Sequence, residues 1–178
     1  DYIDLGGGMG IQYNKEKKLN YNFYKKEIDI LLKKHKSKII FEPGRSIVGD
    51  AGLLITKVIY IKKTKNKDFI ILDSGMNDFM RPALYGAKHR IIPVKRASKK
   101  SNKIQEFVGP ICETTDRFLT LNKFQKLNEN DLLIICDVGA YGMSLSSNYN
   151  VRPKPAEILI KEKKIKIIKK KQKLKDII

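Results

Sequence analysis

Residues 2–10 read YIDLGGGMG and residues 38–45 read KIIFEPGR, so that two short apolar runs each end in a glycine-containing turn. Between them, residues 22–34 place apolar side chains at helical spacing among lysines. The order strand, glycine loop, helix, strand is typical of a parallel α/β sheet or barrel, whose functional groups lie at the carboxyl ends of the strands. Because the first strand begins with nothing before it to pair with, we expect the chain to belong to a longer protein.

After about residue 50 the sequence changes to short runs rich in Ile and Val, which favour strands. We expect strands at 53–61, 69–72, 91–94, 104–108, 117–121, 132–136 and 157–168, and a helical turn near the C-terminal end. The pattern predicts an α/β plus β fold with two parts. Residues 1–49 form the last βα units of an incomplete parallel α/β domain, and residues 50–178 form a β domain.

The 178 residues carry a formal net charge of +18, which raises the possibility of a nucleic-acid partner. Arg contributes only 6 of the 37 basic residues, although base and phosphate recognition favours the Arg fork. Lys, Ile and Asn share A/T-rich codons, and a lysine-rich surface explains the charge without a partner. We therefore expect no nucleic acid. No apolar run reaches the ~20 residues of a membrane span and no leader opens the chain, so we expect a cytoplasmic protein without a membrane partner.

Few residues offer metal or redox chemistry. Cys112 and Cys136 lack metal-ligand spacing, and His35 and His89 stand apart from other candidate ligands. We expect two reduced thiols and no metal site. Cys136 lies within an apolar run and is expected to be buried, whereas His35 lies among lysines and is expected to be solvated.

The two glycine turns permit an anion site. Glycine lets backbone N–H groups approach a phosphate, and Arg45 could pair with the same group as a fork. The alternative is a tight turn without a ligand. Neither the dinucleotide pattern nor a P-loop is present, since residue 11 is Ile and no Gly-Lys-Ser/Thr occurs.

Further candidate segments are polar and contain glycine or aromatic residues. In residues 109–113, GPICE, a thiol precedes a carboxylate and could serve as an acid beside a substrate anchor, the alternative being a core cysteine next to a surface glutamate. Residues 81–85, RPALY, and 139–153 are the others. Four of the six arginines fall in the candidate segments or within four residues of one, which indicates recognition of carboxylate or phosphate: Arg45, Arg81, Arg117 and Arg152.

Taken in order, six segments resemble the fold-type III pyridoxal-phosphate-dependent decarboxylases: IDLGGGMGI, FEPGRSIVGDAG, LDSGMNDFMRPALYGAKH, VGPICETTDRF, GAYGMSLSSNYNVRPKPAEIL and IKIIKKKQKLKDII. The resemblance is greatest to the branch that converts meso-2,6-diaminopimelate to L-lysine and CO2. It covers nearly the whole chain. It implies the C-terminal part of an alanine-racemase-like TIM barrel, followed by a sandwich-like or barrel-like C-terminal β domain. It also implies pyridoxal 5'-phosphate as cofactor and a homodimer with shared active sites.

The resemblance also implies roles for individual residues. Gly6, Gly7, Gly8, Gly44 and Arg45 resemble the cradle of the cofactor phosphate, and Glu42 resembles the carboxylate that pairs with the pyridine nitrogen. Cys112 resembles the acid that returns a proton after CO2 departs, reaching the neighbouring subunit's site. The remaining assignments concern the substrate. Arg45, Arg81 and Tyr85 resemble residues that hold its distal carboxylate, Glu113 one that binds its distal ammonium, and Tyr149 a contact to both cofactor and substrate.

The enzymatic alternatives are related decarboxylases of the carboxynorspermidine, arginine and ornithine type. The non-enzymatic alternatives are a basic binding module and a decayed relative that keeps only the fold. Ornithine-type enzymes carry Asp after the cysteine and lack the RPALY segment, whereas this chain has Glu113 and Arg81. In the resembling family the Schiff-base lysine lies upstream of the region that matches Asp1. We therefore expect residues 1–178 alone neither to bind the cofactor covalently nor to turn over.

Overall fold

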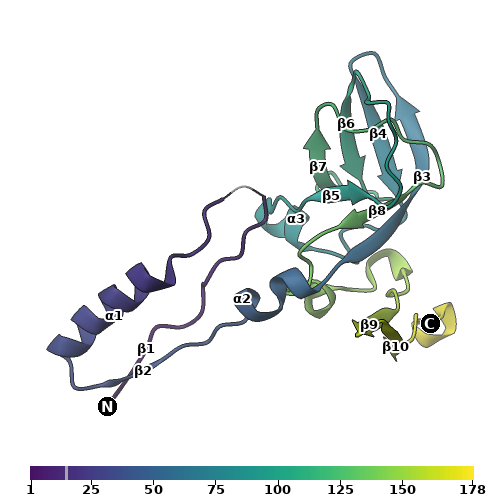
Figure 1. The fold of residues 1–178 in the computed structure, drawn as a ribbon. Helices are drawn as coiled ribbons and strands as arrows, with labels where there is room; N and C mark the ends of the chain where they lie inside the picture. Colours follow the sequence, from purple (N-terminus) through teal and green to yellow (C-terminus); the bar gives the residue numbers. More distant parts are fainter. Residues whose placement is uncertain (15) are drawn as a thin grey trace.

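The computed structural model describes residues 1–14 and 16–178 and begins with a parallel strand pair. Strand β1 (Tyr2–Asp4) pairs in parallel with β2 (Lys38–Ile40), and helix α1 (Tyr21–Lys34) connects them. The Asn20 side chain caps α1 by accepting two backbone N–H bonds at 3.1 Å. The predicted strand–loop–helix–strand unit is confirmed. It extends from the rest of the molecule as an arm (Figure 1), and no residue of α1 is buried.

The main body is one mixed sheet with strand order β5-β8-β3-β4-β6-β7. The predicted strands agree with it to within two residues at each end: β3 (Leu54–Lys63), β4 (Lys67–Leu72), β5 (Ile91–Pro93), β6 (Ile104–Val108), β7 (Arg117–Leu121) and β8 (Leu132–Ile135). Strands β4 and β6 run parallel, and every other neighbouring pair in this sheet is antiparallel. The expected sandwich-like or barrel-like domain is therefore a single curled sheet.

Strand β3 produces the curl because its two halves have different neighbours. Residues 54–57 pair with β8 and residues 58–63 pair with β4, with a register shift between Val58 and Tyr60. Such a bulge bends a strand and increases its twist. The core collects around the bend, where the following side chains are buried: Val58, Ile70, Leu72, Phe79, Ile91, Phe107, Phe118, Leu127, Leu133 and Ile135.

Several short helical elements join these strands and were not predicted. Helix α2 (Arg45–Val48) follows β2 and leads into a 3-10 turn at Gly49–Ala51. Helix α3 (Arg81–Tyr85) has Pro82 in its first turn and ends at Gly86, where φ is 63°. Two more 3-10 turns, Met143–Leu145 and Tyr149–Val151, lie in the polar loop after β8.

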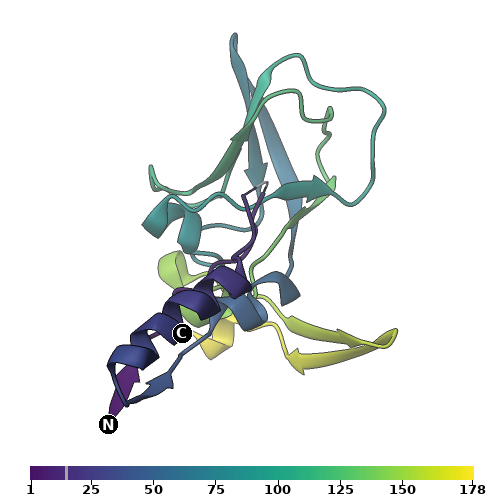
Figure 2. The ribbon, with the colours of Figure 1, turned by 60° about the vertical axis from the view of Figure 1, so that its left-hand side comes forward.

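The C-terminal region is a hairpin rather than the single run predicted for residues 157–168. Strands β9 (Glu157–Lys161) and β10 (Lys164–Lys169) are antiparallel and project from the body (Figure 2). The turn between them uses Glu162 and Lys163 at φ of 50° and 66°. A 3-10 turn at Leu174–Asp176 confirms the predicted helical turn near the C-terminal end.

The TIM barrel implied by the resemblance is not in this chain. The described residues contain the parallel pair of β1 and β2, which forms a two-stranded sheet of its own. No helix among residues 1–14 and 16–178 has the length and apolar character required to cross a membrane.

Candidate functional site

The loop between β6 and β7 presents Cys112 and Glu113 on a rigid support. The Asp116 carboxylate, 3% exposed, accepts the backbone N–H groups of Met76 and Ile111, each at 2.7 Å. Burial raises the pKa of Asp116, while these hydrogen bonds favour its ionised form. A Cβ atom at Gly109 would collide with the same carboxylate, so the turn requires glycine. Cys112 and Glu113 are both exposed at the end of this braced loop.

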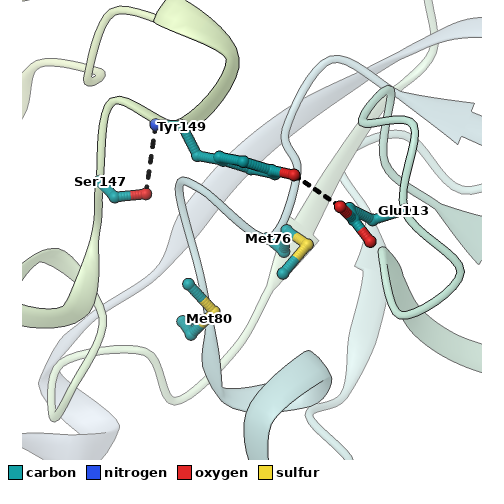
Figure 3. A pocket seen from close by; sticks show the side chains of 5 residues that line it. All are labelled: Met76, Met80, Glu113, Ser147 and Tyr149. Atoms are coloured by element: carbon teal, nitrogen blue, oxygen red, sulfur yellow. Dashed lines mark hydrogen bonds between the residues drawn. The ribbon is translucent and has the colours of Figure 1, made fainter.

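Tyr149 faces Glu113 across the site. Its phenol donates a hydrogen bond of 2.5 Å to Glu113 Oε1, and its backbone N–H donates to Ser147 Oγ at 3.3 Å (Figure 3). The bond to the carboxylate and its negative charge raise the pKa of Tyr149. The phenol therefore stays protonated at neutral pH and acts as a hydrogen-bond donor.

The segment that carries Tyr149 is fastened by a side chain near the C-terminal end. The Gln172 side-chain oxygen accepts hydrogen bonds from Asn148 Nδ2 at 2.7 Å and from the Lys154 backbone N–H at 2.8 Å. The Gln172 backbone N–H in turn donates to the Lys154 carbonyl at 3.1 Å. One residue therefore holds the chain on both sides of Tyr149.

An open pocket of about 560 Å³ lies between these two loops. Its lining residues are Met76, Met80, Glu113, Ser147 and Tyr149 (Figure 3). The two methionines supply an adaptable apolar wall, and Glu113 and Tyr149 supply polar groups on another side. Sequence reasoning missed the methionines, although both lie in the segment LDSGMNDFMRPALY that contributed to the resemblance. The combination of an apolar wall and a few convergent polar groups is typical of small-molecule sites.

The two glycine turns meet at the carboxyl ends of β1 and β2. The Glu42 backbone N–H donates to the Gly6 carbonyl at 2.8 Å. Gly6 and Gly8 have φ of 65° and 79°, conformations that favour glycine, and a Cβ at Gly7 would lie 2.5 Å from the Glu42 carbonyl oxygen. The structure thus brings the residues of the predicted phosphate cradle against the predicted pyridine partner, Glu42.

Gly44 and Arg45 belong to the second of these turns. Gly44 precedes α2 and accepts its first backbone hydrogen bonds, and Arg45 is half-buried at the first position of the helix. A Cβ at Gly44 would lie 4.0 Å from Tyr141 Oη. The turn therefore borders the polar loop after β8.

Arg81, at the start of α3, is a buried cation that faces aromatic rings. It is 6% exposed, and its guanidinium carbon lies 5.5 Å and 5.7 Å from the ring centroids of Tyr13 and Tyr141. Its Nε has no hydrogen-bond partner within the described part of the chain. Tyr85, at the other end of α3, is 66% exposed and is not among the residues that line the pocket. Arg81 follows Met80, so α3 begins at the pocket wall.

The other two arginines of the candidate segments are held by the chain itself. Arg117 forms an ion pair of 3.0 Å with Glu106, and Arg152 donates to the Asp73 carbonyl at 2.5 Å. Both therefore have a structural role within the sheet and its loops, and Arg45 and Arg81 remain as candidate ligands for an anion. Cys136 is 4% exposed and burial raises its pKa, which confirms it as a core thiol. His35 is exposed, as expected.

His89, which stands apart from other candidate ligands in the sequence, lies in the interior of the structure. It is 2% exposed and its ring lies 4.6 Å from Phe79 and 4.7 Å from Tyr13, edge to face in both cases. Burial lowers its pKa, and the Arg81 charge acts in the same direction. Its Nδ1 lies 2.9 Å from the Cys136 carbonyl oxygen, so the neutral ring donates there. Among residues 1–14 and 16–178, no cluster of three or more His, Cys, Asp or Glu is arranged to hold a metal ion.

A curled C-terminal sheet joined to two glycine turns defines the class of protein. The chain belongs to the pyridoxal-dependent decarboxylase family, because residues 13–139 match the model of its C-terminal sheet domain. It is 44% identical over 173 residues to the diaminopimelate decarboxylase of Aquifex aeolicus and 43% identical over 176 residues to that of Helicobacter pylori. These matches cover 96% and 99% of this chain but only 41% and 44% of the relatives.

A solved structure is also similar over nearly the full chain. The diaminopimelate decarboxylase of Helicobacter pylori in complex with L-lysine matches 99% of this chain and 43% of its own, with a TM-score of 0.87 and 42% identity. The chain therefore spans less than half the length of the relatives it matches.

The glycine turns fit the pyridoxal phosphate that the family requires. A Cβ at Gly6 or Gly8 would meet nothing within 4 Å, so one face of this turn is open to a ligand. Backbone N–H groups in such a turn suit an anionic phosphate. Glu42 is exposed beside them, where its carboxylate can accept a hydrogen bond from a ring nitrogen.

Proposed function

We propose that residues 1–178 supply the C-terminal part of an enzyme that decarboxylates meso-2,6-diaminopimelate to L-lysine and CO2. The proposal rests on the hydrogen bond between Tyr149 and Glu113, two residues that line an open pocket. The exposed thiol of Cys112 is next to Glu113 in the chain. The similarity to diaminopimelate decarboxylases over nearly the whole chain supports it. Because the chain spans less than half of those relatives, the activity belongs to a protein in which these residues join a cofactor-carrying barrel. In this division residues 1–49 contribute to the barrel and residues 50–178 form the C-terminal β domain.

The residues of the two glycine turns hold the cofactor in this proposal. Gly6, Gly7, Gly8 and Gly44 present backbone groups to the phosphate, and Arg45 pairs with it. The Glu42 carboxylate keeps the pyridine nitrogen protonated. Pyridoxal phosphate, when bound, supplies the electron sink that allows the bond to the departing carboxylate to break.

Cys112 moves a proton in this proposal, and Glu113 with Tyr149 orients the substrate. The Cys112 thiol delivers a proton to the carbon that has lost CO2. Glu113 accepts hydrogen bonds from the distal ammonium of the substrate, and its carboxylate has lone pairs for both this group and the Tyr149 phenol. Tyr149 thereby fixes the carboxylate in one orientation.

Arg81 determines which substrates are accepted, together with Arg45 and Tyr85. A buried guanidinium without an anionic partner is unfavourable, and the distal carboxylate of diaminopimelate provides that partner. Ornithine lacks this carboxylate and would leave Arg81 unpaired. Sites built around a polar group reject analogues without it strongly.

Assay of the full-length protein with pyridoxal phosphate tests the proposal. The substrates are meso-diaminopimelate, carboxynorspermidine, arginine and ornithine, with CO2 release and amine product measured for each. We expect kcat/KM for diaminopimelate to exceed the others by at least about 100-fold. Failure to form lysine from diaminopimelate contradicts the proposal. Preferential turnover of another substrate would instead assign the protein to the decarboxylase type that acts on that substrate.

The proposal also includes a homodimer with shared active sites, in which Cys112 and Glu113 serve the neighbouring subunit. Mixing two full-length variants tests this part. Each variant has reduced activity alone when pyridoxal phosphate is limiting, one through loss of the thiol in Cys112→Ala and the other through weaker cofactor binding in Gly7→Ala. Activity recovered on mixing supports shared sites, because one of the mixed sites is then intact, whereas no recovery with demonstrated subunit exchange contradicts them.

A further inference from the structure

Arg81 lies in a setting that is unusual for a buried cation. It is 6% exposed, and within the described part of the chain no carboxylate lies within ion-pair distance of it. Burying an unpaired charge is strongly unfavourable unless other groups compensate. Two tyrosine rings do so in part, because the guanidinium carbon lies 5.5 Å from the centroid of Tyr13 and 5.7 Å from that of Tyr141.

The two rings come from segments far apart in the chain. Tyr13 lies in the N-terminal arm, between the glycine turn and α1, and Tyr141 lies in the polar loop after β8. Tyr141 has φ of 58°, a conformation that non-glycine residues seldom adopt and that is found preferentially at functional sites. Its phenol oxygen lies 4.0 Å from the position that a Cβ at Gly44 would occupy, in the turn that precedes α2. The loop is therefore shaped to bring one aromatic ring to both Arg81 and the second glycine turn.

The ring of Tyr13 packs against His89, which in turn packs against Phe79 in the core. His89 packs edge-on against Tyr13 at 4.7 Å and against Phe79 at 4.6 Å on its other side. The bond between His89 Nδ1 and the Cys136 carbonyl anchors these rings in the core at 2.9 Å. Phe79, His89, Tyr13, Arg81 and Tyr141 thus form a continuous series of contacts from the sheet core to the guanidinium.

We propose that Tyr13 and Tyr141 form an aromatic clamp that positions Arg81 for the second carboxylate of the substrate, and so determine specificity. This inference rests on the proposed function. The rings attract the cation through their electron-rich faces, while the N–H donors of a guanidinium lie in its own plane and remain able to bind a carboxylate in bidentate fashion. The clamp thus holds Arg81 in place without consuming the donors that recognise the substrate.

Binding of two amines to the full-length protein with its cofactor tests the clamp. L-Lysine keeps one carboxylate, and cadaverine, 1,5-diaminopentane, has the same carbon chain without it. The variants Tyr13→Leu and Tyr141→Leu remove the aromatic faces, and Tyr13→Phe and Tyr141→Phe keep them. Tyr60→Leu, at a tyrosine of β3 that is 54% exposed, is the matched control for the loss of a ring. Kd is measured by calorimetry for each protein and ligand.

We expect each Leu variant to raise Kd for L-lysine by about 3- to 30-fold, which corresponds to the loss of one cation–π contact. Cadaverine binding changes by less than about twofold, and the Phe variants and Tyr60→Leu resemble the wild type. Unchanged L-lysine binding in both Leu variants, or equal weakening of both amines, overturns the clamp. The wild type forms lysine from diaminopimelate in either case, whereas a wild type that forms none overturns the proposed function instead.

Discussion

The Tyr149 phenol and the Glu113 carboxylate, 36 residues apart in the chain, are joined by a hydrogen bond of 2.5 Å. The bond links the braced loop between β6 and β7 to the 3-10 turn at Tyr149–Val151. A phenol that donates to a carboxylate makes a short, strong hydrogen bond, because the acceptor is charged. Each residue therefore sets the orientation of the other at the edge of the pocket.

A double-mutant cycle measures this link. Tyr149→Phe removes the donor and Glu113→Gln removes the charge of the acceptor, so each weakens binding of L-lysine to the full-length protein. We expect a coupling energy of about 1.5–3 kcal/mol, the range for hydrogen bonds to charged groups. Tyr60→Phe paired with Glu113→Gln is the control and is additive within about 0.5 kcal/mol. Additivity of the Tyr149 pair as well would show that the two residues act independently.

Cys112→Ala separates proton delivery from cofactor binding. A positioned general acid contributes about 10²–10⁴-fold to a reaction, and we expect kcat to fall within this range. The glycine turns are unaltered, so the pyridoxal content, followed by absorbance, stays at the wild-type level. Cys136→Ala is the control at the buried thiol and lowers stability more than kcat. Equal loss of kcat and cofactor in Cys112→Ala would remove this residue from the acid role.

The contact between the two glycine turns can be tested with one methyl group. In Gly7→Ala the new Cβ lies 2.5 Å from the Glu42 carbonyl, so the turns must move apart. We expect Kd for pyridoxal phosphate to rise by at least about tenfold, equivalent to 1.4 kcal/mol. Gly10→Ala is a matched control in the same loop, because its Cβ meets nothing within 4 Å. Similar cofactor affinity in Gly7→Ala and Gly10→Ala would contradict the cradle.

Burial of His89 predicts a dependence of stability on pH. Its pKa in the folded protein is lowered, so the unfolded state binds the extra proton more readily. The stabilisation is fully present above the unfolded value of about 6.5 and is lost as pH falls through the lower folded pKa. The hydrogen bond to the Cys136 carbonyl opposes this lowering of the pKa, as does the Asp137 charge to a smaller degree, and the Arg81 charge reinforces it.

Urea unfolding of the full-length protein at pH 7.5 and pH 5.5 checks this expectation. His89→Gln keeps a donor for the Cys136 carbonyl but cannot titrate, so its stability varies less with pH than that of the wild type. His35→Gln, at the exposed histidine, is the control and retains the wild-type dependence. The same pH dependence in all three proteins would show that His89 does not titrate in the expected sense.

Much of the sheet could be predicted from the sequence because its strands are Ile- and Val-rich runs bounded by polar turns. The hairpin of β9 and β10 could not. Its turn residues, Glu162 and Lys163, adopt positive φ without the Gly or Asn that would have marked a turn. Helix α3 did carry a signal, since Pro82 lies in its first turn and Gly86 follows its end. The parallel pairing of β4 with β6 depends on long-range contacts that no local pattern specifies.

Candidate site residues could be proposed from the sequence where one segment carried a complete motif. Gly6 to Gly8, Glu42 and the Cys112–Glu113 pair are examples, and the structure places each in an exposed or half-buried turn. The partners of Arg81 were not predictable, because Tyr13 and Tyr141 approach it only when the arm and the loop after β8 meet the sheet. For the same reason the burial of His89, between two rings from different segments, could not be inferred.

The N-terminal arm, formed by β1, α1 and β2, links local unfolding to phosphate binding. In a protein made of residues 1–178 alone, none of the side chains of β1, α1 or β2 is buried, so this unit can open locally while the sheet core remains folded. In that protein the amide protons of this unit exchange with solvent well before those of β3 and β4. The cradle formed by Gly6 and Glu42 belongs to this unit. A phosphate bound there would slow that exchange, because it stabilises only the closed form of the unit.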